Sequence, residues 1–181
     1  MSTIVLLSSS PLRPSRLEAI TTQTCRTLSD FGHRVRTIYL RDVPHSALMA
    51  GNDAHPRVRS THRYLDGAET LVAVTPTYHL TASATLLGWL DLVPRATLTG
   101  LAVQAISIGT ARSHAAGMDA TLAAKLRRRA PASVLPGCFV DQEWLTDRAD
   151  GWVPNELLTT RIAAAASAVS GAAAARTALA S

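Results

Sequence analysis

The stretch from Thr3 to Phe31 constrains the fold more than any other part of the chain. A β-branched and leucine-rich run at residues 3–7 predicts a strand, and the hydroxyl- and arginine-rich segment 8–16 follows it directly. Residues 17–31 carry apolar side chains at three- and four-residue spacing, which predicts an amphipathic helix. At the carboxyl edge of a parallel sheet, such a turn presents backbone N–H groups, hydroxyls and guanidinium groups. We therefore expect a phosphate cradle between this strand and this helix.

A plainer interpretation of the same turn remains open. The sequence Ser15-Arg16-Leu17-Glu18 has the form of a helix capping box, with Pro14 just before it. In this interpretation Ser15 only caps its helix, and the neighbouring arginines are solvated. The functional interpretation requires other loops to converge on the same edge of the sheet.

Length and composition indicate a globular, soluble protein. The chain has 181 residues, of which 47% are hydrophobic and 17% charged, so one domain at residues 1–181 can bury a full core. No basic leader precedes the first strand. We expect no apolar run near the roughly 20 residues of a membrane span, and therefore a cytoplasmic protein without a membrane partner.

The net charge and the content of aromatic residues, cysteines and possible metal ligands indicate which kinds of ligand the protein can bind. A net charge of +5 favours anionic partners such as nucleotides. Aromatic residues make up only 4% of the chain and do not alternate with basic residues, which argues against nucleic acid. Cys25 and Cys138 are expected to be buried free thiols. Neither metal-ligand spacing nor a nucleophile elbow is found, so we predict no catalytic side chain and no metal site.

The rest of the chain alternates between strand and helix patterns. Strands are predicted at residues 34–40, 71–74, 101–108 and 134–140, the last interrupted by Pro136-Gly137. Helices are predicted at 57–66, 83–92, 113–130 and 154–179, with a loop or broken helix at 44–56 and a break suspected at Gly171. This pattern predicts an α/β three-layer sandwich around a five-stranded parallel sheet.

Three strand exits carry polar or glycine-containing segments, namely Ser8 to Arg16, Pro76 to His79 and Ser107 to Ala111. In a flavodoxin-like strand order of 2-1-3-4-5, the first, third and fourth strands are neighbours. We therefore expect the three segments to form one site at the carboxyl edge of the sheet.

The ordered set of motifs resembles the NADPH-dependent FMN reductase family, in particular the reductases that serve sulfonate and sulfone monooxygenases. The resemblance covers Ile4 to about Gln142. The resemblance depends on five motifs that occur in the family's order. They are Ser10-Pro11 with Pro14-Ser15-Arg16, the run 71–78 ending in Thr-Pro-x-Tyr, Trp89 to Pro94 with Leu98 and Gly100, Gly109-Thr110, and residues 137–141.

The resemblance implies a flavodoxin-like fold with bound FMN. It implies that Ser10, Ser15 and Arg16 hold the phosphate, with Arg13 replacing an arginine that the family has at the position of Leu12. The isoalloxazine ring would be bordered by Pro76, Thr77, Tyr78 and His79 and by Ser107, Gly109 and Thr110. Ser9 and Ile108 stand where relatives commonly have glycine. We therefore expect modest FMN affinity.

The resemblance also implies a function. NADPH or NADH would deliver a hydride to FMN, and the reduced FMN would pass to a flavin-dependent monooxygenase. A homodimer or homotetramer is expected, with residues 83–92 as the suggested contact. Two alternatives remain: a quinone, azo-dye or chromate reductase with tightly held FMN, and a non-catalytic flavodoxin-like electron carrier. The basic charge argues against the carrier.

Overall fold

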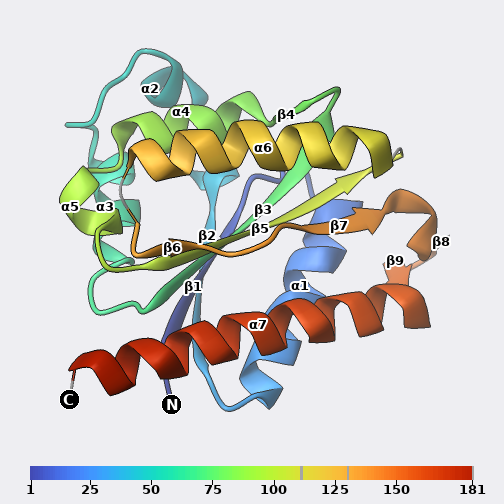
Figure 1. Ribbon diagram of the computed structural model, residues 1–181. Helices are drawn as coiled ribbons and strands as arrows, with labels where there is room; N and C mark the ends of the chain where they lie inside the picture. Colours follow the sequence, from blue (N-terminus) through green and yellow to red (C-terminus); the bar gives the residue numbers. More distant parts are fainter. Residues whose placement is uncertain (111, 130, 181) are drawn as a thin grey trace.

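A parallel sheet forms the centre of the computed structural model, which describes residues 1–110, 112–129 and 131–180. Its strand order is β2-β1-β3-β5-β6, and helices cover both faces (Figure 1). The sheet contains β1 (Thr3–Ser8), β2 (Arg34–Tyr39), β3 (Thr70–Tyr78), β5 (Ala102–Gly109), β6 (Ser133–Val134) and β7 (Cys138–Asp141). The predicted flavodoxin-like α/β fold and its strand order are confirmed.

The edge strand is split in two, as Pro136-Gly137 predicts. β5 pairs with β6 at Ala102 and Val103, and with β7 from Ile106 to Gly109. Between the two pieces, the side chain of Gln104 donates a hydrogen bond to the carbonyl of Pro136 at 3.1 Å. The pairing with β5 is therefore interrupted at Pro136-Gly137, and it resumes in the same parallel direction towards the carboxyl edge.

Two helical layers enclose the sheet. One consists of α1 (Arg16–Asp30) and α7 (Glu156–Ala180), and the other contains α4 (Ala84–Leu92) and α6 (Arg112–Arg128). Shorter helices are α2 (His45–Met49), α3 (Pro56–Arg63) and α5 (Arg95–Leu98). In β1, Ile4 and Leu6 belong to the core beside α1 and α7, whereas Val5 and Leu7 belong to the opposite core. Because both faces of β1 are buried, its sequence contains a continuous run of apolar residues.

Strand β3 is longer than predicted, because it continues through Pro76 to Tyr78. The carbonyl of Val74 accepts a hydrogen bond from the Ser9 N–H, so the backbone polar groups of Val74 point towards β1. Pro76, two residues later, points to the same side, beyond the last paired residue of β1. The missing N–H of the proline therefore removes no bond from the sheet. The short strand β4 (Thr81–Ala82) then pairs antiparallel with Thr77 and Tyr78.

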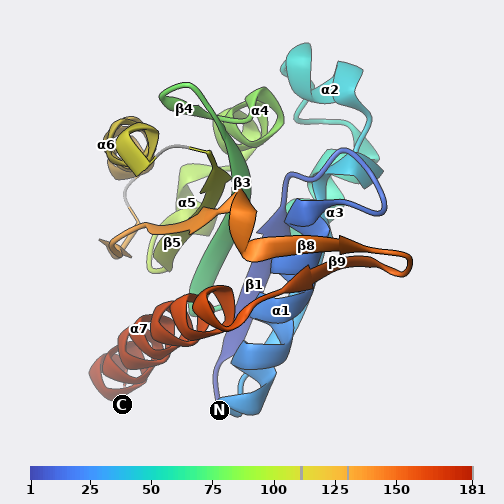
Figure 2. The ribbon, with the colours of Figure 1, turned by 90° about the vertical axis from the view of Figure 1, so that its right-hand side faces the viewer.

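The sequence analysis missed a hairpin that leads into the last helix. β8 (Leu145–Arg148) and β9 (Gly151–Pro154) pair with each other, and Figure 2 shows them beside the beginning of α1. The prediction that Pro154 opens α7 is wrong, since Pro154 ends β9 and the Asn155 side chain accepts the Leu158 N–H at 3.0 Å. Segment 44–56 contains the one short helix α2, and α5 was not predicted.

Helix α7 runs without a break through Gly171. From Glu156 to Ala175 it is long and apolar enough to cross a membrane, which corrects the expectation that no apolar run approaches that length. Leu158, Ile162 and Val169 are buried in the core beside the sheet. The core helix of a soluble protein meets the same two criteria of length and composition.

Candidate functional site

The loop between β1 and α1 brings the two predicted phosphate-binding serines together. The Ser15 hydroxyl caps α1 by accepting the Glu18 N–H at 3.1 Å, and it lies 2.6 Å from the Ser10 hydroxyl. Ser10 is fully buried and also donates to the carbonyl of Leu12 at 3.0 Å. Ser15 therefore caps α1, as its sequence context predicts. A capped helix start beside a second hydroxyl is also an arrangement that suits an anion.

The two predicted arginines leave this loop towards different elements. Arg13 extends to the end of β2, where its Cζ lies 4.8 Å from the centre of the Tyr39 ring and its Nε lies 2.9 Å from Glu18 Oε1. Arg16 extends to the β8–β9 hairpin, where its Cζ lies 3.8 Å from the centre of the Trp152 ring. The loop therefore has a guanidinium group on either side, each resting on an aromatic ring.

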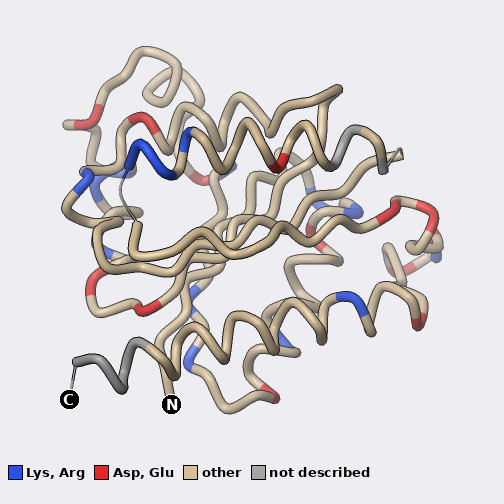
Figure 3. The backbone as a smooth tube through the Cα atoms, in the orientation of Figure 1, with Lys and Arg blue, Asp and Glu red and all other residues tan. Residues whose placement is uncertain are grey.

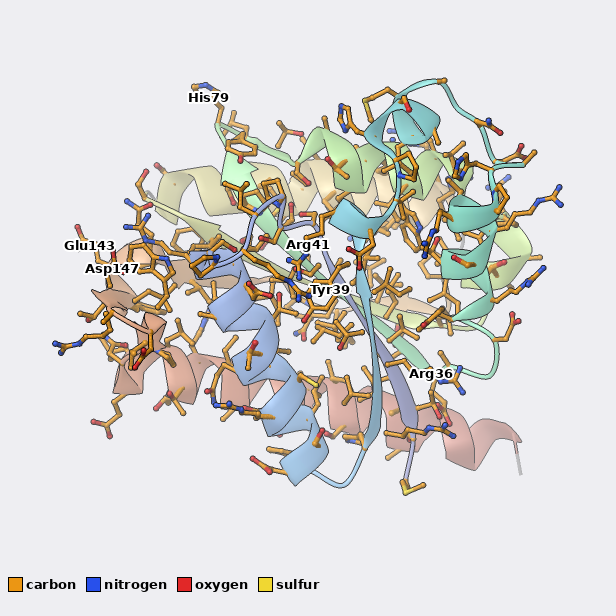
Figure 4. The ribbon with its side chains drawn as sticks, turned by 180° about the vertical axis from the view of Figure 1, so that it is seen from behind. Arg36, Tyr39, Arg41, His79, Glu143 and Asp147 are labelled. Atoms are coloured by element: carbon orange, nitrogen blue, oxygen red, sulfur yellow. The ribbon has the colours of Figure 1, made fainter. Side chains whose placement is uncertain are left out.

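Tyr39 and Arg41 are neighbours of the loop that the sequence analysis did not identify. Arg41 belongs to the single-turn helix η1 (Leu40–Asp42), and its Cζ lies 4.1 Å from the centre of the Tyr39 ring. Burial raises the pKa of the Tyr39 hydroxyl, and the positive charge of Arg13 opposes that rise. Figure 4 shows Tyr39 and Arg41 close together. Their position at the end of β2, which is adjacent to β1, was the available signal.

The second predicted segment is a hairpin tip and not an irregular loop. Pro76 and Thr77 are half-buried in β3, whereas the Tyr78 side chain is 57% exposed. His79 adopts a positive φ of 54° at the turn into β4. Figure 4 shows His79 at this tip, pointing away from the body of the protein. The hairpin thus presents Tyr78 to solvent at the carboxyl edge, where an aromatic ring can contact a planar ligand.

The third segment lies at the end of β5, where its Gly109 is close to Thr77 of the second segment. A Cβ atom added to Gly109 would lie 3.4 Å from the Cβ of Thr77 and 3.3 Å from the Phe139 ring. Ser107 is 1% exposed, and Thr110 is exposed. Ile108 packs into the core beside α7, so its side chain does not cover this edge.

Two buried hydroxyls near this contact have no hydrogen-bond partner among the described residues. They are Thr77 Oγ1 and Ser107 Oγ. Buried polar atoms are nearly always paired in folded proteins, so these two hydroxyls are available to water or to a ligand. FMN fits this arrangement, because its phosphate suits the serine loop and its ring carries several hydrogen-bonding atoms.

Of the other hollow and polar regions, one cavity adjoins the first segment, and another cavity and a basic cluster lie apart from all three. A cavity of about 310 Å³ adjoins Ser15 between α1 and the β8–β9 hairpin, and Trp152 lines it. A cavity of about 510 Å³ between α6 and the split edge strand contains none of the predicted site residues. The basic end of α6 lies on the opposite side from the hairpin (Figure 3), and there Arg129 donates to the carbonyl of Asp91 at 2.6 Å. The basic run 127–129 therefore lies away from the three predicted segments.

The strand order and the two helical layers define the flavodoxin-like class of α/β proteins. Oxidised flavodoxin 1 from Bacillus cereus is similar in structure, with a TM-score of 0.62 at 14% identity, covering 94% of this chain and 98% of the flavodoxin. An NADH:FMN oxidoreductase in its apo form gives a TM-score of 0.79 at 20% identity, with 97% and 90% covered. The sequence model of the NADPH-dependent FMN reductase family matches residues 2–146, and the chain belongs to this family.

Two curated relatives agree with this assignment. An FMN reductase (NADPH) from Pseudomonas putida is 28% identical over 155 residues, which cover 86% of this chain and 78% of the relative. A second from Escherichia coli is 26% identical over 144 residues, covering 80% and 75%. The chain is an NAD(P)H:FMN oxidoreductase, with FMN and NADPH as its cofactor and substrate. Most of the β8–β9 hairpin and all of α7 lie beyond the matched residues.

Proposed function

We propose that the three segments at the carboxyl edge form the FMN site of this reductase. Ser10, Ser15 and the first N–H groups of α1 bind the phosphate, and Arg13 and Arg16 approach it from either side. Pro76 to His79 and Ser107 to Thr110 border the isoalloxazine ring. The observation that carries the proposal is the 2.6 Å contact between the Ser10 and Ser15 hydroxyls at the start of α1. Paired hydroxyls at a helix N-terminus suit a phosphate dianion.

The side chains of this site bind and orient, and none is required as an acid, base or nucleophile. FMN supplies the ring that accepts a hydride from the nicotinamide. The exposed Tyr78 shapes the approach of the nicotinamide, and the hydroxyls of Thr77 and Ser107 donate hydrogen bonds at the ring edge. Holding the two rings in contact lowers the barrier, because the reacting groups are oriented before the transfer.

We further propose that FMN exchanges during turnover and that the reduced FMN serves a flavin-dependent monooxygenase. Two features of the phosphate loop support exchange. Leu12 is 68% exposed and supplies no charge, and Arg13 is already ion-paired within the protein. A loop with few free charges holds a phosphate weakly, as a reductase that releases its flavin requires.

Two measurements test this function. The spectrum of the purified protein before and after desalting should show that flavin is lost, and NADPH oxidation should then depend on added FMN. A protein that stays yellow and reduces a quinone directly would support the alternative of tightly held FMN. Folded protein whose NADPH oxidation does not depend on FMN would overturn the proposal.

We also propose a cytoplasmic homodimer or homotetramer, for which residues 83–92, the suggested contact, offer only part of their surface. Leu86, Trp89 and Leu90 of α4 are buried in the core of the chain itself, and the Trp89 indole donates to the Thr61 hydroxyl at 2.7 Å. These side chains are therefore not available to a second subunit. Light scattering at several concentrations would measure the assembly, and a monomer at all of them would remove the proposal.

A further inference from the structure

Two arginines share one carboxylate oxygen beside the phosphate loop. Glu18 lies in the first turn of α1, and its Oε1 is 2.9 Å from Arg13 Nε and 3.1 Å from Arg41 Nη2. Arg13 belongs to the loop itself, whereas Arg41 belongs to η1 after β2. The carboxylate therefore joins the phosphate loop to the end of the neighbouring strand.

The two arginines differ in how firmly they are held. The Arg41 side chain is 12% exposed and stacks on Tyr39, and its Nη1 is buried without a partner among the described residues. The Arg13 side chain is 57% exposed, and it lies farther from the same ring, at 4.8 Å. Arg41 is thus a fixed partner of Glu18, and Arg13 is the one that can exchange.

A flavin phosphate would compete with Glu18 for Arg13. The phosphate carries close to two negative charges at neutral pH, and it binds arginine through short, charge-assisted hydrogen bonds. The Arg13–Glu18 ion pair has one exposed partner, with Arg13 57% and Glu18 21% exposed, so it contributes little to stability and the stronger anion can displace the carboxylate at a modest cost. After displacement, Arg41 still neutralises Glu18.

We propose that Glu18 is an internal competitor of the FMN phosphate. Binding of FMN transfers the Arg13 guanidinium from Glu18 to the phosphate, and release of FMN returns it. This inference rests on the proposed function, and it assigns part of the weak hold on FMN to one carboxylate in the first turn of α1. No covalent bond changes in this exchange.

The experiment compares FMN with riboflavin, which lacks the phosphate. Dissociation constants of both flavins are measured for the wild type, Glu18→Gln, Arg13→Ala and the double variant, each shown to be folded by circular dichroism. Glu18→Gln should tighten FMN binding about two- to fivefold, the range expected for an exposed ion pair, and leave riboflavin unchanged. In the Arg13→Ala background the same substitution should have no effect.

A second variant separates competition from simple repulsion between charges. Glu18→Asp keeps the negative charge but withdraws the carboxylate from Arg13, so competition predicts tighter FMN binding and repulsion predicts no gain. Unchanged FMN affinity in Glu18→Gln, or equal tightening with and without Arg13, would overturn the inference alone. A folded wild type that binds neither flavin would overturn the proposed function as well.

Discussion

The Cζ atom of Arg16 lies 3.8 Å from the centre of the Trp152 ring, so the first residue of α1 is joined to the hairpin that precedes α7. The contact links a residue of the proposed phosphate loop to a segment beyond the family-matched residues. Because a guanidinium on an aromatic face loses rotational freedom before any ligand arrives, we expect Trp152 to orient Arg16 for the proposed phosphate site.

Replacement of this ring should weaken FMN binding. A cation–π contact at an exposed site contributes about 0.5–1 kcal/mol, so Trp152→Leu should raise the dissociation constant of FMN roughly two- to fivefold. Trp152→Phe retains an aromatic face and should retain most of the affinity. Flavin fluorescence titration measures both, and equal affinities of the Leu and Phe variants would refute the role of the ring.

Removal of the Arg16 guanidinium should have a larger effect on FMN. A hydrogen bond to a charged group contributes about 1.5–3 kcal/mol, so Arg16→Ala should weaken FMN binding at least tenfold while the fold remains intact. Arg34→Ala is a matched control, because Arg34 is exposed at the amino end of β2, on the opposite edge of the sheet. If FMN titrations of the two variants agree, the phosphate loop has been misidentified.

A methyl group at Gly109 should disturb the proposed ring-binding end. The added Cβ would lie 3.3 Å from Phe139 and 3.4 Å from Thr77, so one of these side chains must shift. Gly109→Ala should therefore raise the KM for FMN severalfold in steady-state NADPH oxidation. Gly171→Ala is the control: its Cβ meets open space in α7, so it should leave the KM unchanged and stabilise the fold by about 0.5–1 kcal/mol. An unchanged KM for the Gly109 variant would place the ring elsewhere.

The Asp119 carboxyl should make stability depend on pH. Burial raises the pKa of Asp119 above its ordinary value of 3.8, so the folded protein binds a proton where the unfolded chain has lost it. Stability from this group is present below the ordinary pKa and is lost as the pH rises through the folded pKa. Asp119→Asn should be more stable than the wild type at pH 7, by less than about 1 kcal/mol because the group is half open to solvent. Urea unfolding at pH 7 and pH 3 checks this, and a gain that persists at pH 3 would contradict it.

Much of the fold could be predicted because the local patterns and the tertiary structure agree. The run after Thr3 is buried on both faces, and Ser15 caps α1 as its sequence context indicates. The β8–β9 hairpin could not be predicted in this way. Its strands contain charged residues and a proline, and they pair only with each other, so they show no alternating apolar pattern.

The site was predictable only in part, for a similar reason. Ser10 and Ser15 are close in sequence, so their meeting follows from one tight turn. The contacts of Arg13 with Tyr39 and of Arg16 with Trp152 join segments that only the folded sheet and the hairpin bring together. Periodicity within one element carries no information about such partners.

The position of α7 has a consequence for deletion experiments. Its buried side chains cover the same face of the sheet as Ile4, Leu6 and Val72, and α7 begins ten residues after the family-matched segment ends at 146. A protein shortened to residues 1–146 would expose this apolar face to water, and we expect it to aggregate instead of folding. We therefore expect that the part of the chain that identifies the family does not fold stably without α7.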